Sequence, residues 1–290
     1  MPQLIYRIAE QYLVLNTLDP IATAAILPNY EAFRQACLPD GVQPLVEVWG
    51  DCSCTSSVDD KLLEEVEDIY YHSRVYRRAN SDIRIEMTHL GVEEVGCFSP
   101  NWRQLHCRSS LTNKRARYLI DRLIMIAFSI VTSELRMLKV HASVTELHGR
   151  ALIFLGVSGT GKSTHSRLWR QFVPEATLLN DDEPIVRVMP DASVRVYGCP
   201  WSGSTPCYKD RWAEAVAFVH LRQSPENKLT KLSTLQAFDS LFSSSAFMFS
   251  ESRVREQVFN TVADVLERVP VYRLDCRPDE EAVSLTRSLL

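Results

Sequence analysis

The chain has 290 residues, of which 46% are hydrophobic, and a formal net charge of −4. This length exceeds that of a usual single domain, so we expect two domains. The slightly acidic balance excludes a general attraction to nucleic acid or to an anionic membrane. The longest apolar stretch, residues 123–131, is about half a membrane span, and no signal-peptide pattern opens the sequence. Eight scattered cysteines lack the spacing of a zinc site or a disulfide scaffold, which favours reduced thiols and a cytoplasmic location.

Short apolar segments separated by turn residues occupy the first 110 residues. They predict strands at 4–8, 12–15, 44–49, 83–88, 93–97 and 104–108. Ile83, Ile85 and Met87 alternate with polar residues, which is typical of an antiparallel strand with one wet face. A helix is predicted at 59–71, where an apolar stripe has helical spacing. We therefore expect a strand-rich N-terminal domain at 1–110, without a recognisable catalytic motif.

A long helix is predicted between Ser110 and Leu138, with Thr112 or Asn113 as its N-cap. It is apolar nearly all round between residues 119 and 131, which suits a connecting helix at 111–138. The second domain, 139–290, should contain a closing helix at 279–290 and strands at 140–146, 151–155, 177–179, 185–188, 194–197, 213–221, 229–232 and 269–275. Turn residues at 190–192 and 224–227 predict two hairpins. The expected class is α/β, or α+β overall, with a mixed sheet in the C-terminal domain.

Residues 156–164 read Gly-Val-Ser-Gly-Thr-Gly-Lys-Ser-Thr, directly after an apolar strand and before a segment compatible with a helix. In such a loop, glycines let backbone N–H groups turn inward around phosphate oxygens, the lysine reaches the β- and γ-phosphates, and the serine hydroxyl binds Mg²⁺. The following helix adds its positive N-terminus. A plain Gly/Ser connection is the alternative. The residues expected to bind ATP are Gly156, Ser158, Gly159, Thr160, Gly161, Lys162, Ser163 and Thr164.

An apolar strand end runs into three acids at residues 178–183, Leu-Leu-Asn-Asp-Asp-Glu. A carboxylate at the tip of a buried strand beside a phosphate loop can hold Mg²⁺, and a second one can accept the proton of an attacking hydroxyl. The alternative is an ordinary acidic turn. We expect Ser163, Asp181 and Asp182 as metal ligands, and the division of roles between the two aspartates stays open.

These two motifs together resemble the nucleotide motifs shared by HPr kinase/phosphorylases and ATP-dependent phosphoenolpyruvate carboxykinases. Upstream, Lys139-Val140-His141-Ala142-Ser143 resembles the HPr kinase segment that places a histidine just before the phosphate-loop strand. The resemblance covers roughly residues 138–220 and implies an HPr-kinase-like P-loop domain that uses ATP and Mg²⁺. It also implies that His141 lies near the γ-phosphate and the paired acids, whereas a buried histidine bonded to backbone is the alternative.

The resemblance is less specific about the substrate. The chain is too short for a complete phosphoenolpyruvate carboxykinase, and the segment by which HPr kinases recognise their protein substrate is not found. Residues 197–206 instead resemble a signature of HPr-kinase-like proteins of uncharacterised or peptide-modifying type. Such relatives carry a basic residue where Ser204 stands, so Lys209 and Arg211 are the expected substitutes. Trp201 is expected to cover the site within a lid, and the alternative is a structural turn anchored by a core tryptophan.

The expected function is that of an ATP-dependent kinase that phosphorylates a serine-like hydroxyl of a peptide, a protein or a small molecule. Lys162, Asp181, Asp182 and His141 are the expected catalytic residues. The alternative is an ATP-binding regulatory or catalytically weakened module whose N-terminal domain binds a partner. No nucleic-acid or membrane partner is expected. HPr kinases assemble into oligomers, which leaves a homo-oligomer open.

Overall fold

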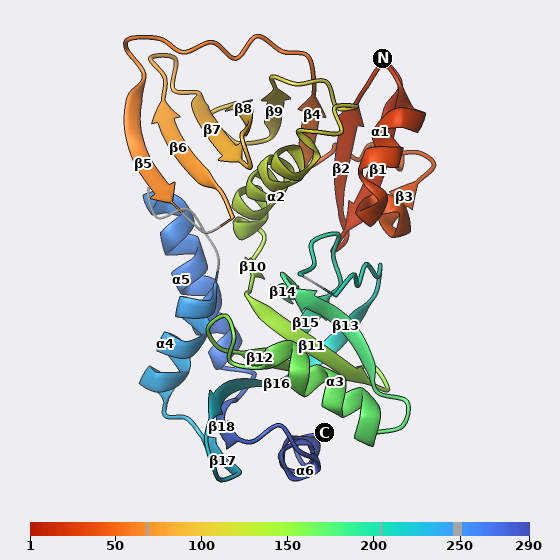
Figure 1. The fold of residues 1–290 in the computed structure, drawn as a ribbon, viewed down its shortest axis with the longest axis vertical. Coiled ribbons are helices and arrows are strands. Elements are labelled where there is room, and N and C mark those ends of the chain that lie inside the picture. Colours follow the sequence, from red (N-terminus) through yellow and green to blue (C-terminus); the bar gives the residue numbers. More distant parts are fainter. Residues whose placement is uncertain (68–69, 204, 246–250) are drawn as a thin grey trace. The chain divides into compact units, whose positions relative to one another are not determined.

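The computed structural model describes residues 1–67, 70–203, 205–245 and 251–290. The chain divides into two compact units, Met1–Val131 and Thr132–Leu290, and each contains its own mixed sheet (Figure 1). The predicted mixed α/β class is therefore confirmed. All eight cysteines are free thiols. Within the described ranges, no helix is both long and apolar enough to cross a membrane.

The first unit is built on nine strands, which agrees with the strand-rich character predicted for the N-terminal part. Their order in the sheet is β3-β1-β2-β4-β9-β8-β7-β6-β5, and only the β2–β4 and β4–β9 pairs are parallel. The strands are β1 (Gln3–Ile8), β2 (Gln11–Asn16), β3 (Arg34–Gln35), β4 (Val46–Trp49), β5 (Lys61–Glu67), β6 (His72–Arg77), β7 (Ile83–His89), β8 (Val92–Phe98) and β9 (Gln104–Cys107). All six strands predicted in this part of the chain are present, with ends that differ by one or two residues.

The predicted helix at 59–71 is wrong, because most of this segment forms β5, which pairs with β6 in an antiparallel arrangement. Glu65 accepts a hydrogen bond from Arg74 Nε at 2.8 Å and lies 2.8 Å from His72 Nε2. These partners come from the neighbouring strand, so sheet pairing outweighs the helical spacing of the apolar residues. Residue 69, which belonged to the predicted stripe, lies outside the described residues.

Helix α2 (Arg117–Ser133) packs on the sheet of the first unit. A Cβ atom on Gly96 of β8 would lie 3.1 Å from the Leu123 side chain, so the helix and the strand approach closely. Asp121 also accepts a hydrogen bond from Tyr30 Oη at 2.7 Å. The long helix predicted over 110–138 is therefore shorter at both ends: Asn113 forms a turn with the Arg115 N–H, and residues 137–139 form a strand. Tyr30 belongs to η1 (Pro28–Phe33), which follows α1 (Pro20–Ile26).

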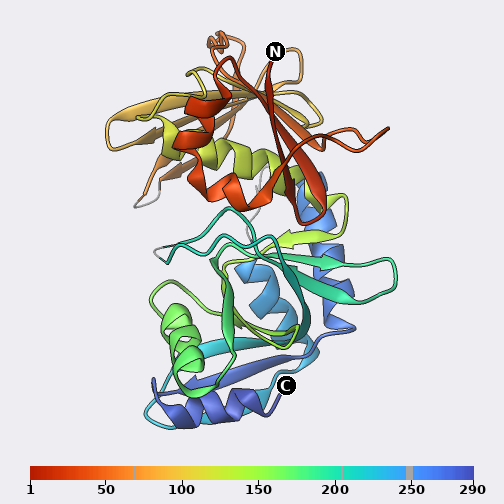
Figure 2. The same ribbon diagram turned by 90° about the vertical axis from the view of Figure 1, so that its right-hand side faces the viewer.

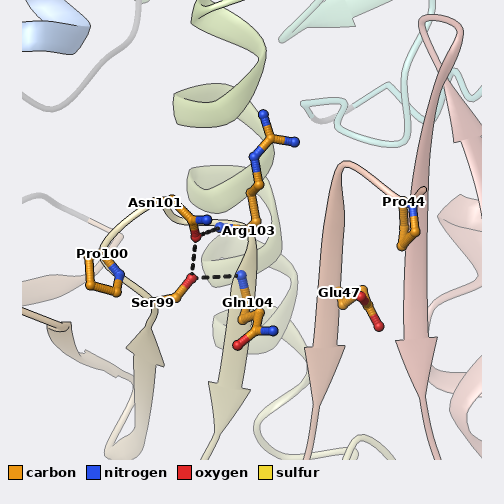
Figure 3. A pocket seen from close by; sticks show the side chains of 7 residues that line it. All are labelled: Pro44, Glu47, Ser99, Pro100, Asn101, Arg103 and Gln104. Atoms are coloured by element: carbon orange, nitrogen blue, oxygen red, sulfur yellow. Dashed lines mark hydrogen bonds between the residues drawn. The ribbon is translucent and has the colours of Figure 1, made fainter.

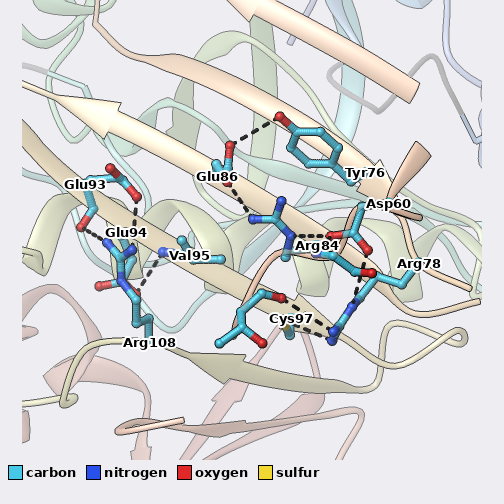
Figure 4. Close-up of polar contacts among 12 residues, drawn as sticks. Asp60, Tyr76, Arg78, Arg84, Glu86, Glu93, Glu94, Val95, Cys97 and Arg108 are labelled. Carbon is cyan, nitrogen blue, oxygen red and sulfur yellow. Dashed lines mark hydrogen bonds and ion pairs between the residues drawn. The ribbon is translucent and has the colours of Figure 1, made fainter. Parts of the chain in front are cut away.

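A buried network of ion pairs joins strands of the first sheet to the segment before β5 (Figure 4). Arg84, 3% exposed, donates to Asp60 at 2.9 Å and to Glu86 at 2.5 Å. Burial alone would raise the pKa of Asp60, but the Ser57 N–H and the Arg84 guanidinium outweigh it and lower that pKa. The charges are therefore paired where solvent is excluded, as a buried charge requires.

The second sheet contains β10 (Met137–Lys139), β11 (Ala142–Leu147), β12 (Arg150–Leu155), β13 (Thr177–Asp182), β14 (Ile185–Val188), β15 (Val194–Tyr197), β16 (Trp212–Gln223), β17 (Lys228–Lys231) and β18 (Val271–Cys276). Its main path is β10-β14-β15-β16-β12-β11-β13. The predicted hairpin at 190–192 joins β14 and β15. The other predicted hairpin is wrong, because β18 pairs with both β16 and β17 and separates them. Local turn residues do not specify that a distant parallel strand enters between two neighbours.

Helices cover both faces of the second sheet. Helices α3 (Lys162–Phe172) and α6 (Glu280–Arg287) share one apolar cluster with alternate residues of β12 and β16, including Phe154 and Val219. Helix α4 (Thr234–Ser244) packs on the other side, so the green α3 and the blue α4 flank the strands in Figure 2. Helix α5 (Ser252–Leu266) contacts α4, β10 and β14. Neither α4 nor α5 was predicted from the sequence.

His165 of α3 should make the stability of the second unit depend on pH. Its ring packs edge-on against Phe154 at 4.6 Å, Nε2 lies 3.3 Å from Thr286 Oγ1, and burial lowers its pKa to about 4. In the unfolded chain the imidazole binds its proton near pH 6.5. The contribution of His165 to the free energy of unfolding is therefore fully present above that pH and is lost as pH falls toward 4. The loss expected from this one group is about 3 kcal/mol.

The measurement is urea unfolding across this pH range. A His165→Gln variant should lose less stability than the wild-type protein as pH falls, while His148→Gln, at an exposed site, should leave the pH dependence unchanged. Parallel curves for the wild-type protein and His165→Gln would contradict the assignment.

Candidate active site

The polar residues singled out in the sequence meet at one edge of the second sheet. Strand β11 is antiparallel to both β12 and β13, so the latter two run in the same direction and end at the same edge. The parallel strand β16 also ends there. The loop after β12, the acids at the end of β13 and His141 just before β11 therefore come together. Ligands commonly bind at the carboxyl ends of strands in α/β sheets.

The loop between β12 and α3 has the backbone that its glycines permit. Gly156, Gly159 and Gly161 have φ angles of 140°, 82° and 102°, in the region that side chains disfavour. A Cβ atom on Gly156 would also lie 2.7 Å from Thr160 Oγ1. Gly161 is the N-cap of α3, so the free N–H groups of the first helical turn adjoin the loop. This geometry suits an anion.

Lys162 begins α3 and folds back over the loop. It is 8% exposed, and its Nζ donates to the carbonyl oxygens of Gly156 at 2.7 Å and Val157 at 3.3 Å. Burial lowers the pKa of Lys162, while the carboxylates of Asp182 and Asp181 act in the opposite direction. The amine is thus held at the mouth of the loop by neutral acceptors, where its charge can turn to an anionic ligand.

Ser163 and Asp181 form the first polar pair of the site. Ser163 Oγ donates to Asp181 Oδ1 at 3.0 Å, and Asp181 is buried. Its backbone carbonyl accepts bonds from Gly203 N and Ser202 Oγ, which fixes the end of β13. Within the described part of the chain, no group of three or more His, Cys, Asp or Glu residues could hold a metal ion. Mg²⁺ needs only one or two protein oxygens when phosphates and waters complete its shell, so this pair fits Mg²⁺.

Asp182 and His141 form the second pair. Asp182 Oδ1 lies 3.1 Å from His141 Nδ1, and the Asp182 side chain is 28% exposed. Its φ of 112° is unusual for a residue other than glycine, and a Cβ atom on Gly203 would lie 3.1 Å from Asp182 Cβ. The His141 backbone N–H donates to Ser244 O at 2.7 Å, which fixes the backbone from which the ring contacts the carboxylate. A strained carboxylate that solvent can reach, oriented by a histidine, is suited to receive a proton.

Two expectations for the segment after β15 are not met. Trp201 is 3% exposed and its carbonyl accepts a bond from Asn180, which fits a structural turn anchored in the core rather than a lid. Lys209 donates to Leu178 O at 2.6 Å and Arg211 pairs with Glu146 at 2.7 Å. These contacts hold both cations away from the 156–161 loop, contrary to the expectation that they replace a charge at Ser204. Residue 204 itself lies outside the described residues.

Two residues at the end of β16 were not predicted from the sequence. His220 is the register partner of Leu155, the last residue of β12, and its Nδ1 lies 2.7 Å from Ser240 Oγ. Gln223 donates to the Gly159 carbonyl of the loop at 3.3 Å. The available signal was a set of polar residues at the end of an apolar run, but only the topology places that run beside the 156–161 loop.

The first unit carries a separate surface depression (Figure 3). Glu47, Asn101, Arg103 and Gln104 are among its lining residues. Ser99 Oγ bonds to Asn101 Oδ1 at 2.7 Å and accepts from Gln104 N at 3.0 Å, so part of this polar lining serves the turn itself. None of the residues expected to bind nucleotide lines it, and it is not part of the candidate site.

No protein-family model matches the chain, and no curated protein matches it significantly. The case for a nucleotide site therefore rests on the residues of this chain and on their geometry. Those residues are a glycine-rich loop at a helix N-terminus, a buried lysine and two carboxylates with different partners.

Proposed function

We propose that the chain is an ATP-dependent kinase that transfers the γ-phosphoryl group to a serine-like hydroxyl of a peptide, a protein or a small molecule. The observation that carries this proposal is the meeting of the 156–161 loop, the Ser163–Asp181 pair and the Asp182–His141 pair at one sheet edge. Phosphoryl transfer requires mainly positioning and charge neutralisation, which are the capacities of these groups.

The nucleotide is bound by the loop and by the start of α3. Backbone N–H groups around Gly159 and Gly161 donate to phosphate oxygens. Lys162 Nζ leaves the Gly156 and Val157 carbonyls and donates to the β- and γ-phosphates. Ser163 Oγ and Asp181 would hold Mg²⁺, which neutralises phosphate charge when it is bound. Burial and the contact with Ser163 favour Asp181 over Asp182 for this role.

Asp182 then serves as the general base. Its carboxylate accepts the proton of the acceptor hydroxyl as the oxygen–phosphorus bond forms and ADP leaves. His141 orients this carboxylate through the 3.1 Å contact. The partial exposure of Asp182 supports the assignment, because an acceptor hydroxyl must reach the base.

We also propose that the second unit is an HPr-kinase-like P-loop domain, and that the protein acts in the cytoplasm. The support for the domain is the motif order His141, 156–161 loop, paired aspartates, each at the same edge of a mixed sheet. The support for the location is that the cysteines are free thiols. The acceptor class is inferred from the resemblance of residues 197–206 to a signature of HPr-kinase-like proteins of uncharacterised or peptide-modifying type.

A second candidate is an ATP-binding regulatory module with weakened catalysis. The contacts of Lys209 with Leu178 and of Arg211 with Glu146 favour it, because neither cation is then available to the transferring phosphate. In that case the first unit would bind a partner.

Mass spectrometry of an acceptor panel incubated with the protein, ATP and Mg²⁺ separates the two candidates. The panel should include serine-containing peptides and small alcohols. A kinase produces ADP together with a phosphorylated acceptor. Nucleotide binding with neither product across the panel would favour the regulatory module and contradict the kinase.

A further inference from the structure

The end of β16 brings a histidine to the phosphate loop. Strand β16 is the parallel neighbour of β12 on the side opposite β11, and His220 pairs in register with Leu155, immediately before Gly156. Adjacent strands lie about 4.8 Å apart, so the His220 backbone stands next to the start of the loop. The Leu221 carbonyl would lie 3.3 Å from a Cβ atom on Gly156, which confirms the close approach.

The His220 side chain lies on the α4 face of the sheet. Val219 and Leu221 belong to the apolar cluster that contains α3, so the alternating residue between them points to the other face. There Ser240 of α4, itself buried, lies 2.7 Å from His220 Nδ1. Among the described residues, this is the single hydrogen bond of the imidazole, which leaves Nε2 for a ligand.

Helix α4 supports both histidines of the site. Ser240 contacts the His220 ring, and Ser244, one turn later, accepts the bond from the His141 backbone N–H. The last turn of α4 therefore holds His220, through the Ser240 side chain, on the β16 side of the loop and His141, through the Ser244 carbonyl, on the β11 side, beside the proposed base.

The His220 ring is neutral near pH 7. Burial lowers its pKa, Asp239 opposes this, and the charges of Lys162 and Arg273 lower it further. When the Ser240 hydroxyl donates to Nδ1, the ring proton resides on Nε2, which is then a donor without a charge of its own.

We propose that His220 is a phosphate-binding residue of the nucleotide site, whose Nε2–H donates to the terminal phosphoryl group of the bound triphosphate while Ser240 holds the ring. This inference rests on the proposed function and deepens it. It adds a group that distinguishes a nucleoside triphosphate from the diphosphate product, since only the former carries the phosphoryl group that His220 contacts.

The test is calorimetric binding of a non-hydrolysable ATP analogue and of ADP, each with Mg²⁺. His220→Ala should weaken binding of the triphosphate analogue about tenfold and binding of ADP less than about twofold, as expected for one lost hydrogen bond to a charged group. His220→Gln, whose amide nitrogen reaches near Nε2, should recover most of the affinity, whereas the shorter His220→Asn should not. Ser240→Ala should weaken analogue binding about threefold.

His148→Ala, at an exposed site, serves as the matched control and should bind both nucleotides as the wild-type protein does. Equal losses for the two nucleotides, or unchanged affinity in His220→Ala, would overturn the inference and leave the proposed function standing. A wild-type protein that binds neither nucleotide would overturn both. If His220→Ala does not fold, the comparison of His220→Gln with His220→Asn decides, and equal analogue affinities in these two would overturn the inference.

Discussion

Replacing Lys162 by alanine should weaken ATP binding by about a hundredfold or more, the largest effect on affinity that we expect for any single substitution. Each hydrogen bond from a charged group contributes about 1.5–3 kcal/mol, and Lys162 is expected to reach two phosphates. The buried position of the amine adds to the effect, because solvent screens a buried charge less than an exposed one. Isothermal titration calorimetry with ATP and Mg²⁺ measures it.

The matched control for this substitution is Lys228→Ala in the exposed start of β17. It removes the same charge and should leave ATP binding unchanged. Lys162→Ala also removes the donor of the Gly156 carbonyl, whereas the Val157 carbonyl keeps its bonds from Thr160, so thermal unfolding of each variant should accompany the titration. Folded Lys162→Ala protein that binds ATP as tightly as the wild-type protein would contradict the assignment of the loop.

Replacing Asp182 by asparagine should lower the rate of phosphoryl transfer by about 10²- to 10⁴-fold, the usual contribution of a general base. Asparagine keeps the size of the side chain and an oxygen that can face His141, so nucleotide binding should be retained. The physical change is the loss of a group that accepts the hydroxyl proton. Single-turnover transfer from labelled ATP measures the rate, and calorimetry measures the binding.

Asp181→Asn is the informative comparison. Asp181 is buried and accepts a hydrogen bond from the Ser163 hydroxyl. Its substitution should therefore raise the Mg²⁺ concentration required for half-maximal activity. Asp191→Asn, in the exposed turn between β14 and β15, should change neither quantity. The proposed division of roles would be wrong if Asp182→Asn altered the Mg²⁺ requirement while Asp181→Asn lowered only the rate.

The sequence was most informative where function depends on local chemistry. The loop, its preceding strand β12 and the start of α3 were predicted together, because glycine conformations, the lysine and the helix start occur within a few consecutive residues. The sequence also placed an acid pair at a strand end. It did not distinguish Asp181 from Asp182, because their difference comes from Ser163 on one side and His141 on the other.

Features that depend on distant pairing were not predictable in this way. Residues 61–67 have helical spacing but form β5, because β6 supplies partners such as Arg74. The turn residues between β16 and β17 predicted a hairpin, but β18 lies between these two strands. Strand β18 begins almost fifty residues after β16 ends. For the same reason His220 was missed: it lies beside the loop only because β16 is parallel to β12.

The most direct test of the proposed kinase is single-turnover incubation of the protein with γ-labelled ATP, Mg²⁺ and a pool of serine-containing peptides. The wild-type protein should transfer label to a peptide hydroxyl, and Asp182→Asn, with ATP binding verified by calorimetry, should not transfer it at a comparable rate. Wild-type protein that binds ATP but yields neither labelled peptide nor ADP, or equal transfer by Asp182→Asn, would contradict the proposal.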